Sequence, residues 1–185
     1  MDAAQSIVAN QLGSPHQSVL HCRNPDRFTP VNSDNLQFVH NGKDHWLLVR
    51  STNGQVQIFD SSRRKLNAVI RRSIQCTYAL FKNRDGCITA NLMNVQRQTD
   101  SFNCRVFAVA YAADIIFGIN PVNSIYDVKL LRAHLIKCLE SASLSPFPKV
   151  SSIGERKRKL VDSHYDIIII WTTTNQIIII SFYCQ

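Results

Sequence analysis

The sequence predicts an α+β fold, and three observations lead to that prediction. Two β-rich runs flank Asn53-Gly54 in "HWLLVRSTNGQVQIFD" (45–60), and this pair is typical of a tight type I′ hairpin turn. The run "CRVFAVAYAADIIFG" from Cys104 is apolar nearly all round, which predicts a central, buried helix. A length of 185 residues with 45% hydrophobic residues suits a globular chain that is mostly one domain.

The first elements are a helix and a short strand. A helix is expected over residues 3–12, because Gly13 and Pro15 follow it as stop signals. Residues 14–35 are rich in Pro, Asn, Ser and Asp, and they predict a loop. The apolar run "LQFVH" then predicts a strand at residues 36–40, before the hairpin.

After the hairpin, "RRKLNAVIRRSIQ" (63–75) predicts a basic helix, most of whose charges would face solvent. Residues 76–82 and 87–95 each predict a strand, with "NRDG" as the turn between them. Asn103 is a residue type that caps helices, so the buried helix is expected to begin at Cys104. A second helix is expected from Asp127 to Glu140.

Residues 1–150 form the predicted domain, and residues 151–185 form a tail with a different composition. The tail begins with the basic cluster "ERKRKL" (155–160), which also fits a nuclear localisation signal or a nucleic-acid patch. It continues with "YDIIIIWTTTNQIIIISFYCQ", which is long enough to raise the question of a membrane span. The polar "TTTNQ" in its middle favours two β-strands and a turn instead.

The hairpin brings a histidine and a carboxylate together. A two-residue turn at Asn53-Gly54 places His45 opposite Ser62 and Asp60 opposite Leu47. His45 and Asp60 are then diagonal neighbours on one face, with Cα atoms about 7–8 Å apart. We therefore expect the imidazole and the carboxylate to meet.

Cys104 is the candidate nucleophile. A cysteine at a helix N-terminus has a stabilised thiolate, because the helix dipole and the free backbone N–H groups favour negative charge. A catalytic cysteine also needs a base, for which His45 is the candidate, and a group that orients the base, for which Asp60 is the candidate. Gln98 is the candidate side-chain donor to an oxyanion; Gln96 is its rival, with poorer spacing.

Taken singly, each of these residues has a structural explanation, and their combination leads to a family. "HW" on a strand, "FDS" at the end of the next, and "QRQTDSFNCRVFAVAYA" entering a helix resemble the SUMO-protease (ubiquitin-like-protein protease) family of cysteine peptidases. The resemblance covers about residues 36–148 and is strongest to compact, transposon-related versions. It implies a papain-like fold, in which helices flank a central mixed or antiparallel sheet and the nucleophile begins a buried helix.

The resemblance also implies residue roles. It assigns the general base to His45, the orienting acid to Asp60, the oxyanion glutamine to Gln98 and the nucleophile to Cys104. Trp46 matches the tryptophan that walls a narrow tunnel for a Gly-Gly C-terminus. The chain departs from the family's Asp-Cys-Gly, because it has Asn103-Cys104-Arg105. A long side chain in place of glycine beside the nucleophile raises the alternative of an inactive copy.

We therefore expect a thiol protease that cleaves after the C-terminal Gly-Gly of a ubiquitin-like protein, with no cofactor and no metal. The main alternative is a catalytically inactive pseudo-protease that binds a ubiquitin-like protein or another acidic partner. The net charge of +8 also leaves nucleic-acid binding as a weaker alternative, and an acyltransferase on the same fold is a further one. Six cysteines without CxxC spacing, and a start that lacks the features of a signal peptide, predict free thiols in the nucleus or cytoplasm.

Overall fold

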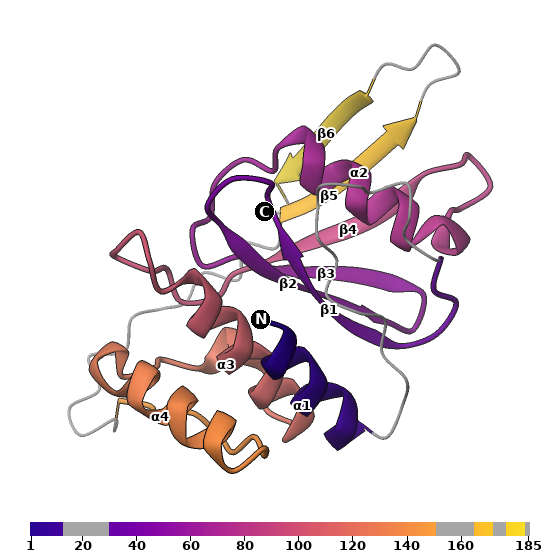
Figure 1. The fold of residues 1–185 in the computed structure, drawn as a ribbon. Helices are drawn as coiled ribbons and strands as arrows, with labels where there is room; N and C mark the ends of the chain where they lie inside the picture. Colours follow the sequence, from indigo (N-terminus) through magenta and orange to yellow (C-terminus); the bar gives the residue numbers. More distant parts are fainter. Residues whose placement is uncertain (13–29, 151–164, 172–176, 184–185) are drawn as a thin grey trace.

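The computed structural model describes residues 1–12, 30–150, 165–171 and 177–183, and it has a mixed α/β fold. Six strands form one sheet in sequence order: β1 (Asn35–His40), β2 (Trp46–Thr52), β3 (Gln55–Phe59), β4 (Ile88–Met93), β5 (Tyr165–Trp171) and β6 (Ile177–Tyr183). Neighbouring strands are antiparallel except β3 and β4, which are parallel and are connected through a helix (Figure 1).

The predicted hairpin is confirmed in its turn and in its register. Asn53 and Gly54 have φ angles of 49° and 75°, the left-handed pair that a type I′ turn requires. Leu48 pairs with Phe59 and Thr52 pairs with Gln55, as a two-residue turn at these positions demands. His45 and Asp60 therefore lie just beyond the paired ends of β2 and β3.

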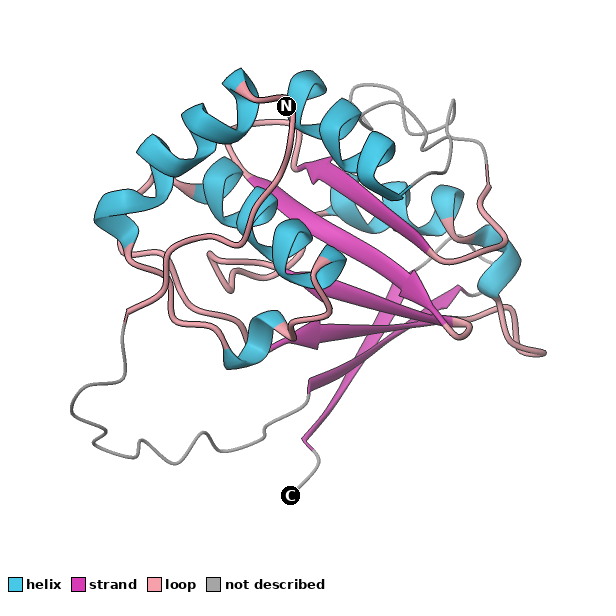
Figure 2. Cartoon of the chain, turned by 90° about the horizontal axis from the view of Figure 1, so that it is seen from below, coloured by secondary structure: helices cyan, strands magenta, loops and turns pink. Residues whose placement is uncertain are grey.

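Helices cover both faces of the sheet. On one face lie α1 (Asp2–Leu12), α3 (Cys104–Ile116) and α4 (Val128–Glu140), and on the other lies α2 (Ala68–Thr77) (Figures 1 and 2). The alternation of side chains along β2 explains this arrangement: Leu48 belongs to the hydrophobic cluster around α3, while Leu47 belongs to the cluster around α2. The central strand β2 is therefore covered on both faces.

The helix α3 is the centre of the larger cluster, as its apolar sequence predicts. Ten of its thirteen residues are buried, and it packs against β2, α1 and α4. Its last turns hold Asp114, which is fully buried and accepts hydrogen bonds from Ser124 and from the Tyr126 hydroxyl (2.7 Å). Lys149 forms an ion pair with the same carboxylate at 3.0 Å. These contacts fix the helix that carries Cys104.

Two predicted elements differ from the structure. The strand expected at 76–82 is wrong, because this segment forms the end of α2 and a 3₁₀ turn at Ala79–Phe81. Ile70, Ile74 and Tyr78 repeat every four residues and are all buried, so a helical face continues through the segment. The helix expected at 63–75 begins only at Ala68, because the Asn67 side chain caps it by accepting the Ile70 N–H at 2.9 Å.

The remaining predicted elements are present with small shifts at their ends. The helices expected at 3–12 and 127–140 correspond to α1 and α4, and the strands expected at 36–40 and 87–95 correspond to β1 and β4. The tail forms two strands, β5 and β6, and β5 pairs with β4. The basic cluster at 155–160 lies outside the described residues, as does most of the loop expected at 14–35.

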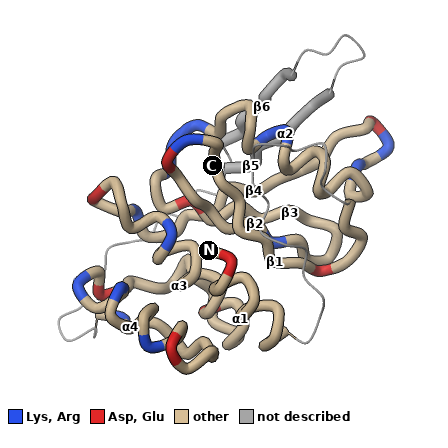
Figure 3. The backbone as a smooth tube through the Cα atoms, viewed as in Figure 1, with Lys and Arg blue, Asp and Glu red and all other residues tan. Residues whose placement is uncertain are grey.

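Charged residues lie mainly on loops and outer helices, and the tube is tan over most of β1, β2 and β3 (Figure 3). Within the described ranges, no helix is both long enough and apolar enough to cross a membrane.

Candidate active site

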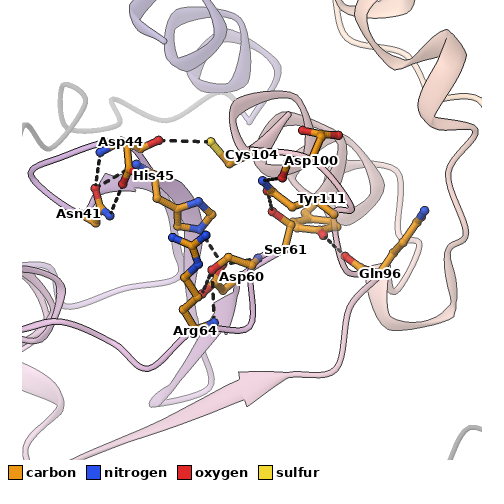
Figure 4. Close-up of polar contacts among 12 residues, drawn as sticks. Asn41, Asp44, His45, Asp60, Ser61, Arg64, Gln96, Asp100, Cys104 and Tyr111 are labelled. Atoms are coloured by element: carbon orange, nitrogen blue, oxygen red, sulfur yellow. Dashed lines mark hydrogen bonds and ion pairs between the residues drawn. The ribbon is translucent and has the colours of Figure 1, made fainter. Parts of the chain in front are cut away.

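His45 and Asp60 form a buried hydrogen bond at the edge where β2 begins and β3 ends. The distance from His45 Nε2 to Asp60 Oδ1 is 2.6 Å, and the two residues are 8% and 2% exposed. Asp60 also accepts the Ser62 N–H at 2.8 Å and the Ser62 hydroxyl at 2.8 Å. The carboxylate is therefore held in place from two sides, and it fixes the imidazole (Figure 4).

Cys104 is the first residue of α3, and its thiol lies next to this pair. It is 3% exposed, and its Sγ is 3.8 Å from the Asp44 carbonyl oxygen (Figure 4). The imidazole interacts with the thiol as well as with Asp60. Because Nε2 is bound to Asp60, the other ring nitrogen, Nδ1, is the one available to Cys104. The structure thus brings Cys104, His45 and Asp60 together.

The ionisation of the three groups is coupled. Burial lowers the pKa of His45, but the hydrogen bonds and charges of Asp60 and Cys104 outweigh it and raise the pKa to about 9. Burial raises the pKa of the Cys104 thiol, but His45 and the backbone N–H groups of Trp46 and Arg105 lower it below its ordinary value. Both shifts favour a thiolate beside an imidazolium, which is the reactive form of a cysteine nucleophile.

The loop before His45 is built on Asn41, which sequence reasoning did not identify. Its side-chain oxygen accepts the backbone N–H groups of Lys43, Asp44 and His45 at 2.9–3.0 Å. Its side-chain nitrogen donates to the Asp44 carboxylate at 3.1 Å (Figure 4). The pattern "NGKDH" could have indicated this role, because asparagine side chains in turns accept backbone N–H groups from residues two or more positions ahead. Asn41 thereby positions both the imidazole and the carbonyl that faces Cys104.

The two glutamines have different environments. The Gln98 side chain accepts the Ser61 hydroxyl at 2.6 Å and donates to the Asp100 carbonyl at 2.6 Å, which holds it between β3 and the loop that leads to Cys104. An amide nitrogen has two hydrogens, and the bond to Asp100 uses one. Gln96, the rival, instead binds the backbone of Tyr126 through both ends of its amide. Gln96 is therefore structural.

Asn103 precedes α3 but does not cap it with its side chain, contrary to the sequence prediction. The side-chain nitrogen of Asn103 donates to Asp100 Oδ2 at 2.7 Å, and its side-chain oxygen accepts from Arg132 Nε at 2.8 Å. Asp100 also accepts the Phe102 and Asn103 N–H groups at 2.9 and 2.7 Å. Long-range contact with Arg132 of α4 thus overrides the local capping preference, and Asp100 organises the loop that ends at Cys104.

Trp46 lies beside the nucleophile and is largely covered. The residue is 5% exposed, and its ring is 4.7 Å from the His40 ring, measured between centroids. The Arg105 guanidinium carbon lies 5.9 Å from the Trp46 ring centroid, which is cation–π distance. The Arg105 guanidinium therefore lies over the tryptophan that the resemblance assigns to substrate binding.

The described residues also include three further cysteines and two further histidines, His40 and His134. Cys87 and Cys138 are buried and Cys76 is half-buried, and all three are free thiols, whereas Cys22 and Cys184 lie outside the described residues. His134 packs against Phe147, with ring centroids 4.6 Å apart. Among the described residues, no group of three or more His, Cys, Asp and Glu side chains has the arrangement of a metal site.

Comparison of the chain with models of protein families, with curated proteins and with solved structures finds no match.

Proposed function

We propose that this chain is a thiol-dependent peptidase of papain-like fold that cleaves after the C-terminal Gly-Gly of a ubiquitin-like protein. One observation carries the proposal: a cysteine at the start of a buried helix lies beside an imidazole whose far nitrogen is bound to a buried carboxylate at 2.6 Å. A merely structural cysteine in an apolar core has no need of such a pair. The combination of groups instead meets the requirements of nucleophilic catalysis.

In the proposed reaction, the Cys104 thiolate attacks the carbonyl carbon of the scissile peptide bond, and the imidazolium of His45 faces the reacting centre. The tetrahedral intermediate collapses to a thioester when His45 gives its proton to the leaving amine. Water then attacks the thioester, His45 takes a proton from that water, and the carboxylic acid and the free enzyme are released. Asp60 keeps the imidazole oriented and stabilises its charged form throughout.

The oxyanion of each intermediate needs hydrogen-bond donors. The first N–H groups of α3 have no intrahelical acceptors, because every α-helix leaves its first four N–H groups without one. The N–H of Cys104 is in the position that suits this role. The second amide hydrogen of Gln98 completes the set in our proposal, and its bonds to Ser61 and Asp100 pre-organise it.

The substrate class comes from the family resemblance of the motifs around His45, Asp60, Gln98 and Cys104. It names a ubiquitin-like protein of the SUMO type as the partner, in the nucleus or cytoplasm. A Gly-Gly end suits a narrow passage, because glycine has no Cβ that would contact flat aromatic walls.

One observation favours the second candidate, a pseudo-protease that binds such a protein without cleaving it. The Arg105 guanidinium lies over Trp46, and the indole is only 5% exposed, which leaves little of it accessible to a substrate main chain. The intact His45–Asp60 pair and the lowered pKa of Cys104 favour the enzyme, since a binding module has no use for a thiolate.

The test uses a panel of ubiquitin-like proteins that carry a C-terminal vinyl sulfone. An active enzyme forms a covalent adduct with at least one member of the panel, and mass spectrometry places the adduct on Cys104. Cys104→Ala abolishes the adduct. Cys76→Ala is the matched control, because Cys76 is a half-buried free thiol on α2, on the opposite face of the sheet from α3 (Figure 1), and this variant retains labelling.

The remaining outcomes separate the candidates. A complex that forms in solution without an adduct selects the pseudo-protease. Absence of both binding and labelling across the panel contradicts both candidates.

A further inference from the structure

Arg105 and Trp46 both lie next to the candidate nucleophile, Cys104, and their side chains also contact each other. The backbone N–H groups of both residues interact with the Cys104 sulfur. The Arg105 guanidinium also lies over the Trp46 ring, with 5.9 Å between the guanidinium carbon and the ring centroid. The guanidinium is therefore located beside Trp46, whose own backbone contacts the Cys104 sulfur.

The charge of Arg105 is not neutralised within the described part of the chain. Arg105 is exposed, and no carboxylate of the described residues forms an ion pair with it. The carboxylates around the site already have donors of their own: Asp44 is bound by Asn41, Asp60 by His45 and Ser62, and Asp100 by Asn103 and Phe102. The guanidinium N–H groups of Arg105 are therefore available to a ligand.

A stacked guanidinium is a good receptor for a carboxylate. Its planar fork donates two parallel hydrogen bonds to the two oxygens of a carboxylate. The stack on Trp46 reduces the rotamer freedom that an exposed arginine would otherwise lose on binding. It leaves the edge of the guanidinium available, because a cation–π contact uses only its face.

We propose that Arg105 is a specificity-determining residue, which selects acyl groups that carry a carboxylate close to the carbon attacked by Cys104. The proposal rests on the proposed function in taking Cys104 as the nucleophile. It adds the substrate chemistry: an acidic side chain at the third residue before the scissile bond, directly ahead of the Gly-Gly, held by the guanidinium over Trp46.

The first test compares two small probes on the full chain. Iodoacetate and iodoacetamide alkylate a thiolate by the same step: the sulfur forms a bond to the CH₂ carbon and iodide leaves. The two reagents differ in that iodoacetate carries a carboxylate. The measured quantity is the ratio of the two alkylation rates at Cys104, followed by peptide mass spectrometry at low ionic strength. The ratio is expected to be higher than that of a small-molecule thiol.

Charge at residue 105 is then varied. Arg105→Gln is expected to lower the ratio about three- to tenfold, because a positive charge near Trp46 that is only weakly screened at low ionic strength is lost. Arg105→Lys is expected to retain most of the ratio, since it keeps the charge but loses the planar fork. Arg84→Gln, an exposed arginine in the turn before β4, is the matched control and leaves the ratio unchanged. A ratio that is the same in the wild type and in Arg105→Gln overturns the proposal.

The second test uses peptidyl vinyl sulfones that end in Gly-Gly, in pairs that differ only by Asp or Asn at the third residue before the electrophile. The Asp member is expected to react about tenfold faster, and the preference is expected to vanish in Arg105→Gln. Equal preferences in both proteins contradict the role of Arg105.

The two tests distinguish this inference from the proposed function. If no peptide or protein vinyl sulfone forms an adduct with Cys104 but the iodoacetate ratio still depends on residue 105, the carboxylate-binding role of Arg105 holds and the peptidase proposal fails. If neither small reagent reaches Cys104, both fail.

Discussion

His45 donates a 2.6 Å hydrogen bond to Asp60 from the neighbouring strand end, and the register of the short β2–β3 hairpin brings the two residues together. The pair is nearly buried, so its electrostatic coupling is much stronger than that of an exposed ion pair. A buried charge with a satisfied partner, placed beside a helix N-terminus and a thiol, is a feature of functional sites more than of cores.

Replacement of the base changes the pH at which the thiol becomes reactive. His45→Gln removes the imidazolium that lowers the pKa of Cys104, while burial still raises that pKa. The pH midpoint for alkylation of Cys104 by iodoacetamide is therefore expected to rise by about one unit or more. Stopped-flow alkylation from pH 5 to 10 measures it. His134→Gln is the control, and an unchanged midpoint in His45→Gln contradicts the ion pair.

Loss of the Asp60 charge is expected to change the pKa of the His45 imidazole. Asp60→Asn keeps an acceptor but removes the charge that raises the pKa of His45, so this pKa is expected to fall from about 9 toward or below its ordinary value of 6.5. Titration of the His45 ring resonances by NMR measures the change. A His45 pKa that stays near 9 in Asp60→Asn assigns the shift to another group.

The His45–Asp60 pair is expected to make the free energy of unfolding fall both at high pH and at low pH. The raised pKa of His45 contributes stability that is complete below 6.5 and is lost as the pH rises through about 9. The lowered pKa of Asp60 contributes stability that is present above 3.8 and is lost as the pH falls through the lowered value. The difference in unfolding free energy between wild type and Asp60→Asn is therefore expected to be largest between pH 3.8 and 6.5. Urea denaturation at pH 5.5 and pH 9.5 tests this, and equal differences at the two pH values contradict it.

Gln98 is expected to matter for acylation and not for thiolate formation. Gln98→Glu keeps an acceptor for the Ser61 hydroxyl but removes both amide donors. Acylation by a substrate carbonyl is expected to slow about 10²- to 10³-fold, the typical effect of losing one oxyanion donor. Alkylation by iodoacetamide, which forms no oxyanion, serves as the internal control when it is measured on the alkaline plateau, where the thiolate is fully formed in both proteins, and there it is expected to stay within about twofold. Equal losses in both reactions mean that Gln98 acts through the geometry of the loop.

Asn41 is expected to act by positioning His45. Asn41→Ala leaves the N–H groups of Lys43, Asp44 and His45 without their acceptor, and we expect a loss of about 1–2 kcal/mol in stability together with slower alkylation of Cys104. Asn41→Asp keeps the accepting oxygen and is expected to recover most of the stability. Loss of stability without any change in the pH profile of alkylation assigns Asn41 a structural role only.

The buried Asp114 anchors the far end of α3. Asp114→Ala leaves Lys149 without its partner and removes the acceptor of Ser124 and Tyr126, which we expect to cost about 3–5 kcal/mol of unfolding free energy. Asp127→Ala, which removes only a helix cap, is the control and is expected to cost about 1 kcal/mol. Urea denaturation measures both, and equal costs contradict the anchoring role.

The sequence predicted those elements whose structure depends on residues close together in the chain. Asn53-Gly54 tolerates positive φ at both positions, so the turn and the register of β2 and β3 follow from two residues, and the meeting of His45 with Asp60 follows from the register. The apolar run after Cys104 likewise predicted a buried α3. Residues 76–82 were misassigned because a short apolar run has the same composition in a strand and in a helix, and only packing against the sheet separates them.

By itself, the sequence determined the hairpin, the buried helix and the residue types of the candidate site, since each depends on backbone preferences within a few positions. Only the tertiary structure decided how these parts meet. In the folded chain the Asn103 side chain binds Arg132 of α4 and does not cap α3. Gln96 binds the backbone of Tyr126, and the Arg105 guanidinium lies over the Trp46 ring. These contacts join residues from different elements, and their energy exists only once the helices have packed on the sheet.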